Sequence, residues 1–333
     1  VEDLASQGQR VLAVASRPAA PDHAELRFDD VEQGLVLLGL VGMIDPPRAE
    51  AVEAVRACRA AGIRVKMITG DHAETAAAIA RQLGLAHDPA VLTGQDLDRI
   101  PEPEFVQAVA RTQVFARTSP EHKLRIVRAL QSRGNVVAMT GDAVNDAAAL
   151  KQADIGVAMG SGSEVTKQAG KLILTDDNFG TLITAIRLGR SVYDKIVAYI
   201  RYQMSKLFSL VLLFLVASIF DINEGVALAP LMVVFQHFFI TLFPVIVIMQ
   251  DPPAPDLMAK PPRDPKQPIT NRASFVQWFA YGVLQFAVTF VAMMVAPGPM
   301  SPTEPNVPMT MGFVVLSLGS VFAGLVMRRD PES

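Results

Sequence analysis

Four apolar runs in the second half of the sequence constrain the fold of this chain more than any other feature. They cover about residues 199–220, 226–249, 275–296 and 309–327 of the 333 residues. Each run is close to the roughly 20 residues that an α-helix needs to cross the hydrocarbon core of a bilayer. Hydrophobic residues make up 50% of the chain, and they concentrate after about residue 199. The sequence therefore predicts a soluble half followed by a membrane half with four spans.

Basic residues beside these runs indicate how the spans are oriented. They lie before or at the start of the first run, between the second and third, and after the fourth: Lys195, Arg201, Lys260, Arg263, Lys266, Arg272, Arg328 and Arg329. The other two connections, 221–225 and 297–308, contain no Lys or Arg. Because positively charged loops stay in the cytoplasm, we expect a multi-pass cell-membrane protein whose soluble half is cytoplasmic. Four buried helices in a soluble core, the alternative, would not explain the alternation.

Helix and strand patterns alternate through the soluble half. The first 40 residues are predicted to form a helix and two short strands, at 10–15 and 34–39. After them, helices are predicted at 49–61, 73–85, 120–133 and 145–153, and strands at 64–68, 113–116, 135–139 and 155–159. Such alternation with short loops predicts an α/β, Rossmann-like domain whose parallel sheet is wrapped by helices. In such sheets, ligands bind beyond the carboxyl ends of the strands.

Charge and cysteine content exclude several classes of function. The net charge of −3 gives no electrostatic footprint for nucleic acid. Cys58 is the only cysteine, which excludes an internal disulfide framework and a metal cluster built from cysteines. We expect Cys58 to be a small apolar contact on a helix.

Two polar clusters follow predicted strands and could contact a phosphoryl group. In the Thr-Gly-Asp sequence at 69–71, the Thr69 hydroxyl and the unobstructed Gly70 backbone could donate to phosphoryl oxygens. A helix cap is the alternative for this turn. In the second cluster, at 118–123, the ammonium group of Lys123 could neutralise phosphoryl charge. A solvated surface lysine is the alternative there.

A third cluster, Thr-Gly-Asp-Ala-Val-Asn-Asp at 140–146, contains paired carboxylates. Asp142 and Asp146 are four residues apart across a loop-to-helix junction, so both can face one point. Mg²⁺ prefers hard oxygen ligands, usually one or two carboxylates plus phosphate and water. A cap or Asx-turn is the alternative. Together with the other two clusters at the same sheet edge, these residues predict a phosphoryl-transfer site.

These motifs, in this order, resemble those of P-type cation pumps of the calcium/sodium-pump type. The resemblance covers the whole chain and rests on Asp-Pro-Pro-Arg at 45–48, Met-Ile-Thr-Gly-Asp at 67–71, Thr-Ser-Pro-Glu-His-Lys at 118–123, the cluster at 139–146, and the runs 153–160 and 199–202. It implies a haloacid-dehalogenase-like phosphorylation domain at 43–192 that lacks its first strand. Residues 1–42 would end the nucleotide-binding domain, and 193–333 would form the transmembrane domain.

The resemblance also implies individual roles, with ATP and Mg²⁺ as cofactors and a transported cation as partner. It implies metal ligation by Asp142 and Asp146, with Asn145 beside them supporting the metal and the phosphoryl group. It also implies phosphoryl contacts from Thr69, Gly70 and Lys123, and nucleotide contacts from Arg10 and Asp71. The Asp-Lys-Thr-Gly-Thr segment that carries the phosphorylated aspartate in this family does not occur in the sequence. We therefore expect a C-terminal fragment of a pump that lacks its N-terminal part and is inactive alone.

Two other functions fit the same residues. A membrane-tethered, Mg²⁺-dependent phosphatase of the same fold would use these clusters without transport, although four spans argue against it. A truncated, non-catalytic membrane protein would have no need of the missing aspartate.

The resemblance places His237 and Thr241 where the family binds cations. Lys206, in the first span, could extend to the interface. Alternatively, it could act as a built-in countercharge, so that transport would involve protons or a singly charged ion. Pro244 is predicted to break the second span and to free the carbonyl of Thr241 for coordination.

Overall fold

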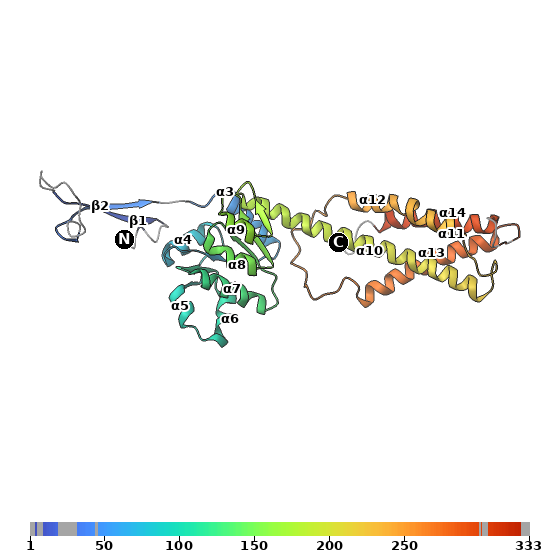
Figure 1. The fold of residues 1–333 in the computed structure, drawn as a ribbon, viewed down its shortest axis with the longest axis horizontal. Helices are drawn as coiled ribbons and strands as arrows, with labels where there is room; N and C mark the ends of the chain where they lie inside the picture. Colours follow the sequence, from blue (N-terminus) through green and yellow to red (C-terminus); the bar gives the residue numbers. More distant parts are fainter. Residues whose placement is uncertain are drawn as a thin grey trace. The chain divides into compact units, whose positions relative to one another are not determined.

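The computed structural model describes residues 4, 9–18, 32–43, 46–299, 301 and 306–327. The chain forms two compact units, residues 1–185 with 259–262 and residues 186–258 with 263–333 (Figure 1). We call them the soluble unit and the membrane unit. The helix predicted near the N-terminus falls mostly on residues outside the described ranges.

Strands of the soluble unit form one antiparallel hairpin and two parallel sheets. The hairpin pairs β1 (Arg10–Ser16) with β2 (Val36–Met43). The first parallel sheet has the order β3 (Met67–Ile68), β5 (Val114–Ala116), β4 (Val91–Thr93), and the second has the order β6 (Ala138–Gly141), β7 (Ile155–Met159), β8 (Leu172–Leu174). The predicted α/β class is confirmed, but among the described residues no ladder joins β3 to β6. The sequence predicts one parallel sheet, whereas the structure has two.

Helices connect these strands. They are α3 (Ala49–Ala60), α4 (Ala73–Gln82), α5 (Gly94–Arg99), α6 (Glu102–Arg111), α7 (Pro120–Ser132), the 3₁₀ turn η1 (Val144–Asp146), α8 (Ala147–Gln152) and α9 (Glu164–Ala169). Phe105 and Val109 of α6 pack with Phe115 of β5 and Ile126 of α7 in one apolar core. Cys58 is buried on α3, as expected.

The membrane unit contains α10 (Phe179–Ile219), α11 (Pro230–Phe235), the π-helix η2 (Gln236–Ile240), α12 (Leu242–Gln250), α13 (Arg272–Val295) and α14 (Val307–Val326). Four stretches are long and apolar enough to cross a membrane, with α11, η2 and α12 together forming the second. The four predicted spans are therefore confirmed by length and composition. The first helix differs from the prediction because it begins at Phe179, before the apolar run.

The hydrogen-bonding pattern of the second span departs from that of an α-helix in η2, which lies before Pro244. In η2 the N–H of Thr241 donates to the carbonyl of Gln236 at 3.1 Å, which is a π-helical bond. The carbonyl of Thr241 accepts a hydrogen bond from the N–H of Val245 at 3.3 Å. The prediction that Pro244 frees this carbonyl is therefore wrong. A proline removes the bond to the residue four positions earlier, which is Ile240 rather than Thr241.

Asp154 joins the second parallel sheet to α7. Its Oδ2 accepts hydrogen bonds from the N–H of Val137 at 2.8 Å and from Nε2 of Gln131 at 3.1 Å. The hydrogen bond from Val137, with a smaller contribution from Gln131, lowers the pKa of Asp154 below its usual value of 3.8. The carboxylate therefore stabilises the folded state only while it is ionised.

We expect Asp154→Ala to lower the free energy of unfolding of the soluble unit by about 1 kcal/mol at pH 7, because two donors lose their acceptor. Since the folded state holds this pKa below the unfolded value, the contribution is present above that value and disappears as the pH falls through the folded pKa. Variant and wild type should therefore converge in strong acid.

Urea unfolding of the full chain in detergent, followed by circular dichroism, measures this difference. Asp88→Ala is the control, because Asp88 is exposed and makes no hydrogen bond among the described residues. Equal midpoints for Asp154→Ala and wild type at pH 7 would contradict the assignment.

Candidate functional site

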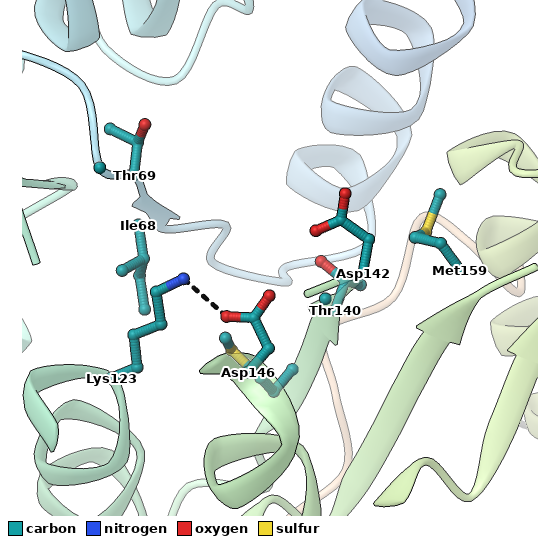
Figure 2. Close-up of a pocket in the computed structure, with 10 residues that line it drawn as sticks. Ile68, Thr69, Lys123, Thr140, Asp142, Asp146 and Met159 are labelled. Atoms are coloured by element: carbon teal, nitrogen blue, oxygen red, sulfur yellow. Dashed lines mark hydrogen bonds and ion pairs between the residues drawn. The ribbon is translucent and has the colours of Figure 1, made fainter. Parts of the chain in front are cut away.

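A pocket of about 340 Å³ lies where β3 and β6 end (Figure 2). Its lining residues are Ile68, Thr69, Gly70, Lys123, Met139, Thr140, Gly141, Asp142, Asp146 and Met159. The structure thus brings together Thr69, Lys123, Asp142 and Asp146, from all three polar clusters, as the sequence predicts. The pocket is bordered by one edge strand of each parallel sheet.

An ion pair crosses the pocket. Nζ of Lys123, in the first turn of α7, donates to Oδ1 of Asp146 at 2.6 Å, as Figure 2 shows. Only 17% of the Lys123 side chain and 6% of the Asp146 side chain are exposed. A charged hydrogen bond with so little solvent around it is stronger than an exposed ion pair. Of the lining residues, Lys123 alone carries a positive charge.

Asp142 presents the second carboxylate of the pocket. Its side chain is exposed and has no hydrogen bond or ion pair within the described part of the chain. Oδ2 of Asp146 accepts the N–H of Ala143 at 3.3 Å. No cluster of three or more potential metal-ligating side chains occurs among the described residues. Two carboxylates fit Mg²⁺, which takes its remaining ligands from phosphate and water.

The Thr69 turn is closed by hydrogen bonds between Thr69 and Asp71 and does not cap α4. Oγ1 of Thr69 donates to Oδ2 of Asp71 at 2.9 Å and accepts the N–H of Asp71 at 3.1 Å. The turn precedes α4 but no side chain caps this helix, whose N-cap residue is His72. Thr69 and Gly70 line the pocket instead. Oγ1 of Thr118 donates to the carbonyl of Thr69 at 3.2 Å, which ties the loops after β3 and β5 together.

Two of the residues assigned by the family resemblance do not line this pocket. Asp71 and Asn145 are not among its lining residues, and Asn145 is exposed in η1. Arg10 begins β1, and its side chain lies outside the part that the structure describes. Asp45, the first residue of the Asp-Pro-Pro-Arg motif, is also outside the described residues.

Thr140 lines the pocket and was not predicted as a site residue. A sequence signal for it exists, because Thr-Gly-Asp occurs twice, at 69–71 and at 140–142. The first copy follows the edge strand β3, and the second overlaps the last two residues of the edge strand β6. The repetition could therefore have identified Thr140 as the counterpart of Thr69.

In the membrane unit, the structure brings together Lys206 and Thr241 but not His237. Lys206 is 3% exposed, and its Nζ donates to Oγ1 of Thr241. Oγ1 of Thr241 donates in turn to the carbonyl of Gln236 at 2.8 Å. His237 lies on the exposed side of η2, where Nδ1 is 3.3 Å from the carbonyl of Val233.

Gln236 takes the buried position that the sequence suggested for His237. It is 1% exposed; its Oε1 accepts from Oγ of Ser317 at 2.6 Å, and its Nε2 donates to Oγ of Ser320 at 2.9 Å. Nε2 of Gln285 also donates to Ser320, at 3.1 Å. These four side chains form a buried polar network among η2, α13 and α14.

Gly141 lies so close to Asp146 that a side chain would not fit. A Cβ atom on Gly141 would be 2.5 Å from Cβ of Asp146, whereas one on Gly70 would have no neighbour within 4 Å. We expect Gly141→Ala to destabilise the soluble unit by about 1–3 kcal/mol. Gly70→Ala should stay within about 0.5 kcal/mol of wild type in the same urea titration. A Gly141→Ala protein as stable as Gly70→Ala would contradict this packing.

Family models match both halves of the chain. A haloacid dehalogenase-like hydrolase model matches residues 6–154, and a second model of that description matches residues 124–186. A model described as cation transporting ATPase, C-terminus, matches residues 225–333.

Individual relatives match across both halves. A calcium-transporting ATPase of Listeria monocytogenes is 42% identical over 306 residues, which cover 89% of this chain and 34% of that protein. One of Bacillus subtilis is 41% identical, covering 88% of this chain and 33% of its own length. The probable cation-transporting ATPase F of Mycobacterium tuberculosis is 45% identical, with 80% and 30% covered. The chain spans about a third of the length of these relatives.

Proposed function

Because the chain belongs to the family of P-type cation-transporting ATPases, we propose that it takes part in ATP-driven cation transport across a membrane. In this proposal the soluble unit holds the phosphoryl group of ATP, and the membrane unit forms part of the cation path. The observation that carries the proposal is the pocket in which Thr69, Lys123, Asp142 and Asp146 converge.

Each lining residue has a role that follows from its chemistry. Asp142 and Asp146 would hold Mg²⁺, which when bound supplies positive charge against the phosphoryl oxygens. Lys123 would contact a phosphoryl oxygen with its ammonium group, and Thr69 and Gly70 would donate hydrogen bonds to others. Contacts to ATP from Arg10 and Asp71, and support of the metal and the phosphoryl group by Asn145, are proposed on the family resemblance.

The phosphorylated aspartate would come from a strand outside these 333 residues. Among the described residues that line the pocket, only Asp142 and Asp146 carry carboxylates, and no Asp-Lys-Thr-Gly-Thr run occurs in the sequence. Among the described strands, β3 pairs only with β5 and β6 only with β7, and both β3 and β6 border the pocket. An additional strand between them would join the two parallel sheets and would end at the pocket. This arrangement supports a phosphorylation domain at 43–192 that lacks one strand.

A chimera tests this proposal. When the part of the Bacillus subtilis calcium-transporting ATPase that precedes the matched region is placed before residue 1, we expect an acid-stable phosphoprotein from radiolabelled ATP. Asp142→Asn or Lys123→Met should lower the phosphoprotein by about 100-fold, because each removes charge stabilisation at the reacting group. Lys167→Met is the matched control, because Lys167 pairs with Glu164 on α9, which contributes no residue to the pocket.

The 333-residue chain alone is expected to form no aspartyl-phosphate. Unchanged phosphorylation of the Asp142→Asn chimera would remove the metal assignment. Hydrolysis of a small phosphate ester by the chain alone would instead favour the membrane-tethered phosphatase.

The chemistry of the spans suggests which kind of cation they accept. None of the four apolar runs contains Asp or Glu. Divalent cations usually require carboxylate ligands, whereas Lys206 is a buried positive charge held on Thr241. We propose that Lys206 is a built-in countercharge and that these spans favour protons or a singly charged ion.

Transport by the Lys206→Ala chimera tests the countercharge. We expect the variant to lose its wild-type ion dependence, with roughly a tenfold change in apparent affinity for the transported ion, because the repulsion from a nearby charge is removed. Lys195→Ala is the control, because Nζ of Lys195 donates to the carbonyl of Met249 at 2.7 Å and the residue is only half-buried, unlike Lys206. An unchanged ion dependence in Lys206→Ala would end the countercharge hypothesis.

A further inference from the structure

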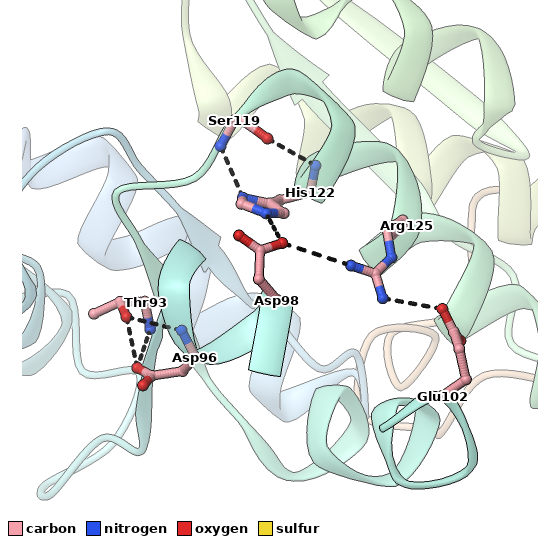
Figure 3. A network of polar contacts seen from close by, with 7 residues as sticks. All are labelled: Thr93, Asp96, Asp98, Glu102, Ser119, His122 and Arg125. Atoms are coloured by element: carbon pink, nitrogen blue, oxygen red, sulfur yellow. Dashed lines mark hydrogen bonds and ion pairs between the residues drawn. The ribbon is translucent and has the colours of Figure 1, made fainter. Parts of the chain in front are cut away.

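The first turn of α7, which carries Lys123, is held by the residue just before that lysine. Oγ of Ser119 accepts the N–H of His122 at 3.2 Å, and the N–H of Ser119 donates to Nδ1 of His122 at 3.1 Å (Figure 3). This is a capping box with histidine where Glu or Gln is usual. Because Nδ1 accepts a hydrogen bond, the ring proton of neutral His122 is on Nε2.

The other ring nitrogen of His122 reaches a different helix. Nε2 lies 2.9 Å from Oδ1 of Asp98 on α5, so it donates to that carboxylate. The ring is 12% exposed. Gly94, the first residue of α5, packs against it: a Cβ there would be 2.9 Å from Cε1 of His122. A glutamine at position 122 could form the capping box, but its amide would not occupy the position of Nε2.

Two further charged groups surround this contact. Arg125 lies 4.0 Å from Oδ1 of Asp98 and donates to Oε1 of Glu102 at 3.0 Å. Its guanidinium also stacks over the ring of Phe105. Asp98 and Glu102 thus share Arg125, but only Asp98 contacts His122. Substitution of Asp98 can therefore be compared with substitution of Glu102, which contacts Arg125 but not His122.

We propose that Asp98 and His122 are positioning residues for Lys123. The N–H of Lys123 donates to the carbonyl of Ser119 at 3.2 Å, so the lysine backbone belongs to the turn that His122 fixes. Asp98 anchors the ring, the ring anchors the turn, and the turn sets where the ammonium group meets Asp146. The part of this inference that concerns a phosphoryl group rests on the proposed function. The part that concerns Lys123 itself does not.

The reactivity of Lys123 tests the inference directly. The full chain in detergent is treated with an amine-acylating reagent, and the labelling rate of each lysine is measured by mass spectrometry. In Asp98→Ala and in His122→Gln we expect Lys123 to react about threefold faster or more, because the turn opens more often. The double variant should react no faster than the faster single variant, since both changes break one contact.

Glu102→Ala is the matched control and should leave Lys123 unchanged, because Glu102 contacts Arg125 but not His122. Lys167 serves as an internal reference in every sample. Equal labelling of Lys123 in Asp98→Ala and wild type would overturn the inference. Faster labelling of all lysines together with a lower urea midpoint would also overturn it, because the pair would then only stabilise the fold.

A phosphate titration separates this inference from the proposed function. With Mg²⁺ present, binding of inorganic phosphate to the wild-type chain is followed by phosphorus NMR. We expect roughly threefold weaker binding in Asp98→Ala and His122→Gln at an unchanged urea midpoint. Absence of phosphate binding by wild type would count against the proposed function, and the labelling rates would still decide the positioning role.

Discussion

A buried carboxylate needs a compensating charge, and the soluble unit is arranged around that requirement. Asp146 is 4% exposed, and a charge so far from water is costly unless it is paired and hydrogen-bonded. The compensating ammonium comes from Lys123 on α7, 23 residues earlier in the chain. The pair therefore requires α7 and η1 to meet at the end of β6, and Gly141 permits the approach because it has no side chain. The pocket is a consequence of this contact.

Thr69 and Asp142 could be predicted because each one directly follows a strand whose apolar pattern is strong. Lys123 lies in the first turn of α7 and was predicted from its charge and its motif, whereas Thr140, inside β6, was not predicted. The elements β4 and α5 were missed, because β4 has three residues and α5 has six, too few for a period to emerge. The contact between Asp98 and His122 was also beyond the sequence, since it joins residues that are 24 positions apart and share no motif. Periodicity predicts that a strand exists but not which strand it pairs with, so the division into two sheets had no sequence signal.

In the membrane unit, hydropathy predicted the four spans, while their inward-facing residues depended on local geometry. A π-helical turn inserts one residue relative to an α-helix. This shift accounts for the burial of Gln236 and the exposure of His237. Pro244 was the visible irregularity in the sequence, yet the departure from α-helical bonding begins eight residues earlier, at Gln236. The polar network of Gln236, Gln285, Ser317 and Ser320 was therefore not foreseeable from apolar runs alone.

Within the described part of the chain, β3 and β6 each have one edge that pairs with no other strand. These edges also bear on how this polypeptide behaves at high concentration. An open strand edge offers N–H and C=O groups to any extended segment, which is the usual start of aggregation or domain swapping. Here the edges are short, two residues in β3 and four in β6, and short edges are poor templates for foreign strands. Because these edges are short, the proposed additional strand between β3 and β6 would form few backbone hydrogen bonds and would gain little stability from them alone. It would have to be selected by its side chains and by tethering within one polypeptide, which raises its effective concentration.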